Sequence, residues 1–131
     1  TNDLTQYTMA ADRLLGDLAH LNNPWQPAVL KMIKMTVEGA QRASVTAGKK
    51  KYVSVCGEAA ADPALAVVLI GLGVDTLSMN AGAIPAVAAV LKSVTKEKAQ
   101  QIAAIALQQI SSAEAKESAR KALPILDELG L

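Results

Sequence analysis

The sequence predicts an α/β fold built on a parallel β-sheet. Short runs rich in β-branched residues alternate with segments of helical periodicity, which is typical of parallel strands joined by right-handed crossovers. The strand expected over 52–56 is apolar at successive positions, so we expect both of its faces to be covered. The only cysteine, Cys56, ends this strand. Parallel strands carry their chemistry at their carboxyl ends, so Cys56 lies where a site is expected.

The first half of the chain is expected to hold one long helix before that strand. We interpret residues 1–4 as the loop that follows a strand, the strand itself lying outside this chain. Residues 5–11 are expected to form a short helical turn. An Asn-Asn-Pro sequence at 22–24 precedes the long helix, which ends near Gly48. Its apolar stripe recurs at helical spacing and comprises Val29, Leu30, Ile33, Val37 and Ala40.

A second helix follows the cysteine. Asp62 and Pro63 are typical of an N-cap and a first helical position, and Gly71 and Gly73 indicate the end of the helix. The apolar run 64–74 is about half as long as a bilayer span requires, so it does not predict a membrane-spanning helix.

The rest of the chain is expected to turn from mixed structure to helices alone. Residues 76–79 predict a short third strand, and residues 84–94 its following helix. A helix over 95–110 begins with a threonine that can cap it, and the Ser-to-Glu spacing at 111–114 fits a capping box. Pro124 should kink or break the last helix.

Composition restricts the classes of partner. The 131 residues suffice for one domain, and the formal net charge is only +1. This balance gives no basis for binding nucleic acid or an anionic membrane, so we expect neither partner. One unpaired cysteine fits a reducing compartment, so we expect a cytoplasmic protein.

The first residues supply a second candidate for chemistry. Asn2, Asp3 and Arg13 place an amide, a carboxylate and a guanidinium within a short polar stretch. Carboxylate and amide oxygens suit Mg²⁺, and the planar fork of arginine matches a phosphate or carboxylate. The plainer alternative is an Asn-Asp turn with a solvated arginine. For Cys56 the plainer alternative is a buried apolar side chain.

Three segments resemble the Enzyme I family of the bacterial phosphoenolpyruvate:sugar phosphotransferase system, a branch of the phosphoenolpyruvate (PEP)-utilising enzymes. The first segment is Thr1-Asn2-Asp3-Leu4-Thr5-Gln6-Tyr7-Thr8-Met9-Ala10-Ala11-Asp12-Arg13. The second joins His20-Leu21 to Pro27-Ala28-Val29-Leu30, and the third runs from Val55-Cys56-Gly57-Glu58 through Gly71-Leu72-Gly73-Val74-Asp75 to Leu77-Ser78-Met79. The resemblance weakens after Asn80.

The resemblance implies a fold and a domain. Residues 1–131 would be the C-terminal portion of a PEP-binding (β/α)₈ TIM barrel, about its last three βα units plus C-terminal helices. The phosphohistidine and HPr-binding domains would lie outside this chain. We therefore expect the chain alone to be inactive, and to self-associate through uncovered strand edges besides the homodimer that the family implies.

The resemblance also implies a reaction. Enzymes of this family move the phosphoryl group of PEP to a histidine in a separate domain, release pyruvate, and pass the phosphate to the carrier protein HPr for sugar uptake. Asp3 would bind Mg²⁺, Asn2 and Asp3 would contact PEP, and Arg13 would hold its phosphate. The cysteine that matches Cys56 would give a proton to the enolate.

Two residue groups and two alternatives complete the expectations. We interpret His20 as a loop residue near the site rather than as the phosphoacceptor, and Lys49-Lys50-Lys51 as a solvated turn on the opposite rim. The chain could instead be the C-terminal part of a pyruvate phosphate dikinase or PEP synthase. It could also be a non-catalytic α/β structural module.

Overall fold

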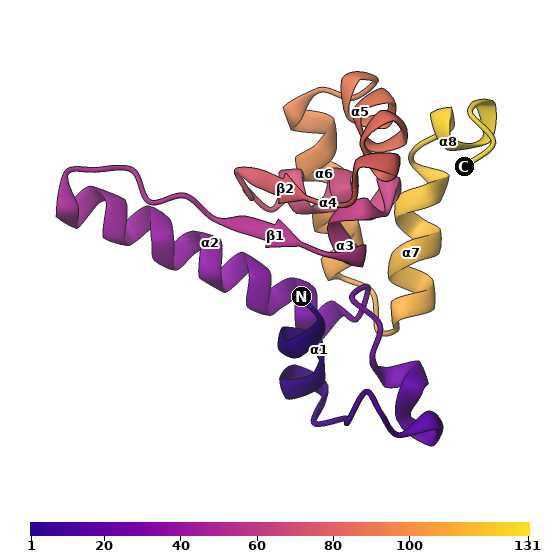
Figure 1. Ribbon diagram of the computed structural model, residues 1–131. Coiled ribbons are helices and arrows are strands. Elements are labelled where there is room, and N and C mark those ends of the chain that lie inside the picture. Colours follow the sequence, from indigo (N-terminus) through magenta and orange to yellow (C-terminus); the bar gives the residue numbers. More distant parts are fainter.

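The computed structural model describes all of residues 1–131. Helices predominate and surround one short sheet (Figure 1). In order the elements are α1 (Asn2–Met9), η1 (Gly16–Leu21), α2 (Pro27–Ala47), β1 (Ser54–Cys56), α3 (Glu58–Ala61), α4 (Pro63–Gly71), β2 (Thr76–Ser78), η2 (Ala81–Ala83), α5 (Ile84–Lys92), α6 (Lys96–Leu107), α7 (Ser112–Lys121) and α8 (Ile125–Glu128), where η marks a 3₁₀ helix.

The two strands form a parallel sheet, which confirms the α/β class. Ser54 pairs with Thr76, Val55 with Leu77, and Cys56 with Ser78. Helices α3 and α4 make the crossover between the strands. A two-stranded sheet does not test whether a larger barrel surrounds it, so the (β/α)₈ barrel stays a prediction.

The expectation that the first strand is covered on both faces is wrong. The strand is shorter than 52–56, and only its central residue Val55 is buried, while Ser54 and Cys56 are exposed. The side chains of successive strand residues point to opposite faces, so one face of β1 packs on the core and the other is open.

Helix α4 is the buried centre of the molecule. The six residues from Ala64 to Leu69 are each at most 1% exposed, because α3, α5, α6 and α7 all pack against this helix. Asp62 caps it as expected, accepting hydrogen bonds from the backbone N–H of Ala64 and Leu65. The apolar run is therefore a core helix, and no helix of the chain combines the length and hydropathy needed to cross a bilayer.

The loop expected over 1–4 is wrong, because helix α1 already begins at Asn2. The Thr1 carbonyl accepts hydrogen bonds from both the backbone N–H and the hydroxyl of Thr5, each at 2.8 Å. Thr5 is buried, so its polar side chain is satisfied inside the first turn. The helix ends where Ala10 takes a left-handed conformation with φ of 50°.

The long helix and the N-caps of the two helices α6 and α7 are confirmed. Helix α2 ends at Ala47, and Gly48, whose φ is 61°, forms its C-cap. Thr95 accepts a hydrogen bond from the backbone N–H of Lys98, and Ser111 accepts one from Glu114. Pro124 separates the last two helices, while α6 ends earlier than expected, and the short helices η1, α3 and η2 were not predicted.

The close packing of α4 against α6 makes a pair of glycine substitutions informative. A Cβ added at Gly71 would collide with the backbone carbonyl of Ala99, whereas one added at Gly39 in α2 meets nothing closer than Arg42 Nη2 at 3.9 Å. We expect Gly71→Ala to lower the free energy of unfolding by about 1–3 kcal/mol. Gly39→Ala should raise it by about 0.5–1 kcal/mol. Urea unfolding measures both, and equal effects of the two substitutions would contradict this packing.

Candidate functional site

The carboxyl end of β1 presents the thiol. Cys56 is exposed, which rules out the alternative that it is a buried apolar side chain. Gly57 follows with φ of 89°, and its N–H donates to the Ser78 carbonyl at 3.0 Å. This left-handed glycine ends the strand pairing and turns the chain into α3, which leaves the thiol at the rim of the sheet.

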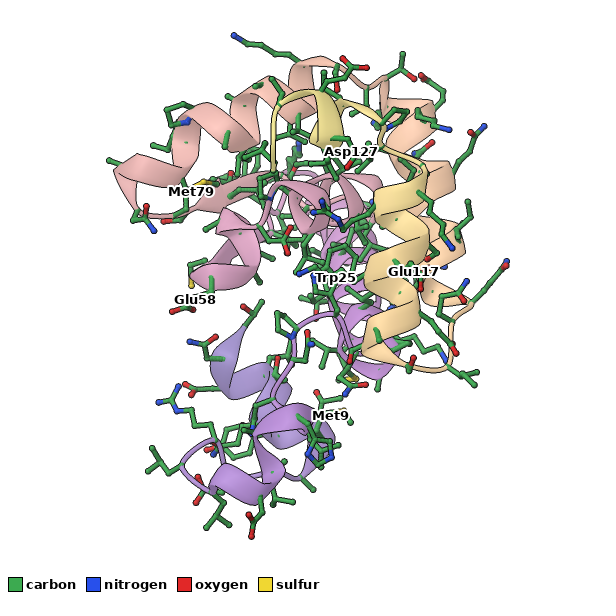
Figure 2. All side chains as sticks on the ribbon, turned by 90° about the vertical axis from the view of Figure 1, so that its right-hand side faces the viewer. Met9, Trp25, Glu58, Met79, Glu117 and Asp127 are labelled. Atoms are coloured by element: carbon green, nitrogen blue, oxygen red, sulfur yellow. The ribbon has the colours of Figure 1, made fainter.

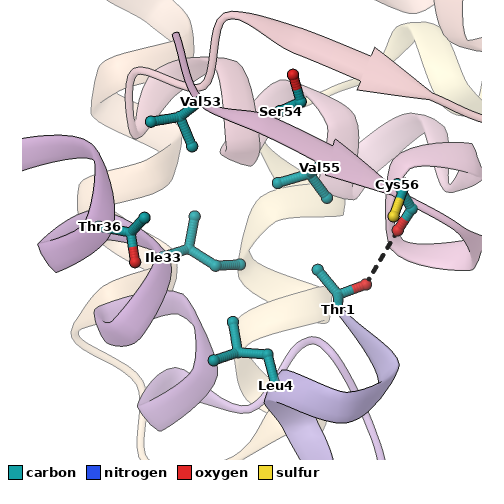
Figure 3. Close-up of a pocket in the computed structure, with 8 residues that line it drawn as sticks. All are labelled: Thr1, Leu4, Ile33, Thr36, Val53, Ser54, Val55 and Cys56. Carbon is teal, nitrogen blue, oxygen red and sulfur yellow. Dashed lines mark hydrogen bonds between the residues drawn. The ribbon is translucent and has the colours of Figure 1, made fainter. Parts of the chain in front are cut away.

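Helix α1 brings the first residues of the chain to this rim. The Thr1 hydroxyl donates to the Cys56 carbonyl at 3.3 Å (Figure 3). The Asn2 amide donates from Nδ2 to Glu58 Oε2 at 3.1 Å. Figure 2 shows Glu58 directly beyond the start of α1. Two contacts, each between residues more than fifty positions apart in sequence, thus join the start of α1 to the carboxyl end of β1.

Asp3 and Arg13 also lie together. The left-handed turn at Ala10 reverses the chain. The backbone N–H of Arg13 then donates to Gln6 Oε1 at 3.3 Å. Arg13 Nη1 then lies 3.4 Å from Asp3 Oδ1. Both side chains are largely exposed, and this single contact leaves most N–H groups of the guanidinium available to a ligand.

Glu58 is a site residue that the sequence-based prediction did not include. A hydrogen bond from its own backbone N–H, and then the one from Asn2, lower the pKa of its carboxyl; the positive N-terminus and Arg13 act in the same direction. The carboxyl is therefore held as a carboxylate. Its signal in the sequence was its position two residues after the strand-ending Cys56.

The donor set fits a magnesium ion only if a substrate completes the coordination. The chain holds no cluster of three His, Cys, Asp or Glu side chains that could bind a metal. Asp3 offers one exposed carboxylate, and the Glu58 carboxylate already accepts from Asn2. Mg²⁺ is commonly held by one or two carboxylates together with substrate phosphate and water, which suits this arrangement.

A groove of about 140 Å³ opens beside the thiol. It lies between α1, α2 and β1, as Figure 3 shows. Leu4, Ile33 and Val55 give it apolar walls, and Thr1 and Cys56 stand at one end. A small molecule that carries an apolar carbon could thus approach the thiol along the apolar wall of the groove.

Two residue groups lie apart from these contacts. His20 is exposed in η1, and its Nδ1 lies 3.1 Å from the Asp17 carbonyl. Lys49, Lys50 and Lys51 form an exposed turn before β1, at the opposite end of the strand from Cys56, as predicted. Lys50 is not free in solvent, because it pairs with Asp75 at 2.7 Å and lies over the Tyr52 ring.

An amide, two carboxylates, a guanidinium and a thiol thus lie near the carboxyl end of a parallel strand, which is where α/β enzymes place their sites. Residues 1–96 match the family described as PEP-utilising enzyme, PEP-binding domain. The chain belongs to this family of PEP-utilising enzymes. The resemblance seen in the sequence is thereby confirmed.

Curated relatives share much of the chain. It is 46% identical over 123 residues to a phosphoenolpyruvate-protein phosphotransferase of Streptomyces coelicolor, which covers 94% of the chain and 21% of the relative. It is 43% identical over 102 residues to the protein of that name from Geobacillus stearothermophilus, covering 78% of the chain and 17% of the relative. It is 37% identical over 114 residues to the protein of that name from Haemophilus influenzae, which covers 87% of the chain and 19% of the relative. The chain thus spans about a fifth of these relatives.

The contact between Asn2 and Glu58 predicts a measurable titration. Asn2→Ala removes the amide donor, so the pKa of Glu58 should rise toward its usual value. Because the native pKa is lowered, the contribution of Glu58 to stability is present above its unfolded pKa and is lost as pH falls through the folded pKa. Carboxyl NMR titration measures the shift. Gln101→Ala, on the exposed side of α6, is the control, and an unmoved Glu58 pKa in Asn2→Ala would contradict the contact.

Proposed function

We propose that this chain forms part of the substrate site of a phosphoenolpyruvate-protein phosphotransferase. The whole protein would transfer the phosphoryl group of PEP to a histidine in another domain and then to HPr, releasing pyruvate. One observation carries the proposal: the segment that holds Asn2, Asp3 and Arg13 contacts the carboxyl end of the Cys56 strand, in a chain whose residues 1–96 match a PEP-binding domain. The names of the curated relatives favour this activity over that of a dikinase or PEP synthase.

The polar residues would bind and orient PEP. Phosphoryl transfer depends mainly on positioning and on stabilising charge. Arg13 would hold the phosphoryl oxygens with its planar fork, and Asn2 would contact the substrate beside it. Asp3 would be the ligand for Mg²⁺, which supplies charge neutralisation at the phosphate when it is bound.

Cys56 would protonate the product. When the phosphoryl group leaves, its P–O bond electrons remain on the enolate of pyruvate. The methylene carbon of that enolate then takes the proton from the Cys56 sulfur, a C–H bond forms, and the resulting thiolate regains a proton from water. The exposed thiol beside the apolar groove suits this step, because the enolate carbon that takes the proton must approach the sulfur directly.

The broader properties follow from the same proposal. The whole protein would complete the (β/α)₈ barrel and work as a cytoplasmic homodimer. This chain would contribute residues 1–131 of the PEP-binding domain and would be inactive by itself, since it spans only about a fifth of the relatives.

The role of Cys56 is tested in the full-length protein. Cys56→Ala should lower the rate of pyruvate formation from PEP by about 10²–10⁴-fold, because the positioned proton donor is lost. PEP binding should change little. Ser78→Ala is the matched control, since Ser78 pairs with Cys56 on the neighbouring strand. A normal pyruvate-release rate in Cys56→Ala would exclude the proton-donor role.

The roles of Asp3 and Arg13 are tested by substitutions that keep shape or charge. Asp3→Asn removes a charge, so the Mg²⁺ concentration required for activity should rise sharply. Arg13→Lys keeps the charge but loses the planar fork of the guanidinium, so the free energy of PEP binding should weaken by no more than about 3 kcal/mol. Titration of PEP at fixed Mg²⁺ measures both, with Arg42→Lys on the exposed side of α2 as control. Wild-type binding in both variants would remove these residues from the site.

A further inference from the structure

Two hydrogen bonds join the start of helix α1 to the end of β1 and the turn that follows it. In the first, the Thr1 hydroxyl donates to the Cys56 carbonyl at 3.3 Å (Figure 3). In the second, Asn2 Nδ2 donates to Glu58 Oε2 at 3.1 Å. The acceptor of the second bond is charged, which makes it the stronger of the two. Glu58 is therefore the main polar link between α1 and this turn.

This link connects the two halves of the proposed site. Asp3 and Arg13, the proposed ligands of Mg²⁺ and of the phosphoryl group, lie in α1 and in the turn that follows it. Cys56, the proposed proton donor, ends β1 two residues before Glu58. Protonation of the enolate requires the sulfur and the methylene carbon to lie at reacting distance. The two halves must therefore keep one relative position.

Glu58 also determines the orientation of the Asn2 amide. At neutral pH a carboxylate only accepts hydrogen bonds, so the nitrogen of the amide, and not its oxygen, must face Glu58. Asn2 Nδ2 uses one of its two N–H groups in this bond. The second N–H and Oδ1 remain for a ligand. A single bond thus fixes both the place and the orientation of a proposed substrate contact.

We propose that Glu58 is a positioning residue for protonation of the product: through its hydrogen bond to Asn2, it holds the substrate ligands of α1 at a fixed position relative to the Cys56 thiol. The inference rests on the proposed function and adds a residue to it. Glu58 does not itself bind PEP in this scheme, because two negative charges repel each other. Asp3 and Arg13 stay in place when Glu58 is removed, so PEP binding should depend on it only weakly.

The test measures pyruvate formation from PEP by the full-length protein. Glu58→Ala removes the acceptor, so kcat should fall about ten-fold, while the KM for PEP should change less than about three-fold. Glu58→Gln loses the charge but keeps an acceptor oxygen, so its kcat should return to within about three-fold of wild type.

Glu97→Ala is the matched control. Both Glu58 and Glu97 lie in the first turn of a helix, and each carboxylate accepts from its own backbone N–H. Glu97 follows Lys96, which lies beside Lys51 at the far end of β1 from the thiol. Glu97→Ala should therefore weaken a helix end as Glu58→Ala does and keep the wild-type kcat.

Two further measurements separate positioning from a structural role. In Asn2→Ala/Glu58→Ala, kcat should be no lower than in Asn2→Ala, because Glu58 acts through Asn2. The second measurement uses PEP with deuterium and tritium at defined positions on its methylene carbon. The wild type should give pyruvate whose methyl group has one configuration. Glu58→Ala should give a mixture, because a displaced enolate takes part of its protons from water.

Four results would overturn the inference and leave the proposed function intact. They are a wild-type kcat in Glu58→Ala, an equal loss of kcat in Glu97→Ala, additive effects of the Asn2 and Glu58 substitutions, and a Glu58→Gln variant as slow as Glu58→Ala. The last would mean that the charge of Glu58 matters rather than its bond to Asn2. If the wild-type protein forms no pyruvate from PEP, the proposed function fails and the inference fails with it.

Discussion

The carboxylate of Asp62 joins three parts of the fold, and the rest of the structure depends on this junction. Its Oδ1 accepts from the N–H groups of Ala64 and Leu65 at 2.9 and 3.2 Å, which caps the buried helix α4. Its Oδ2 accepts from the Trp25 indole at 3.0 Å and lies 4.0 Å from Lys116 of α7. Figure 2 shows Trp25, in the segment that leads into α2, next to helix α7. One side chain thus links α4, α7 and the segment that carries Trp25.

The buried helix transmits this constraint to the candidate site. Helix α4 connects β1 to β2, so its position determines how the two strands pair and where Cys56 ends. Its C-terminal Gly71 lies so close to the Ala99 carbonyl that α6 has no room to shift toward it. The rim of the sheet therefore lies on closely packed helices, and the backbone that carries the Cys56 thiol is held in place.

Local signals in the sequence predicted the elements that local chemistry controls. The Asp62, Thr95 and Ser111 caps need only their own N–H neighbours, and all three are confirmed. The burial of β1 on one face alone was not predictable, because it depends on which helices cover the strand. The role of Glu58 was missed for a similar reason: its partner Asn2 lies 56 residues away, and no periodicity links the two. The barrel was expected from the resemblance, and the two strands of this chain leave it a prediction.

The candidate site contributes little to the stability of the fold, and this separation suits binding. Asp3 and Arg13 are 77% and 52% exposed and are joined by one contact of 3.4 Å. An exposed ion pair of this kind contributes about 0–1 kcal/mol, so exchanging it for a substrate costs the fold little. The core around α4 holds the chain together without these residues. Asp3 and Arg13 can therefore exchange charge partners while the scaffold keeps its shape.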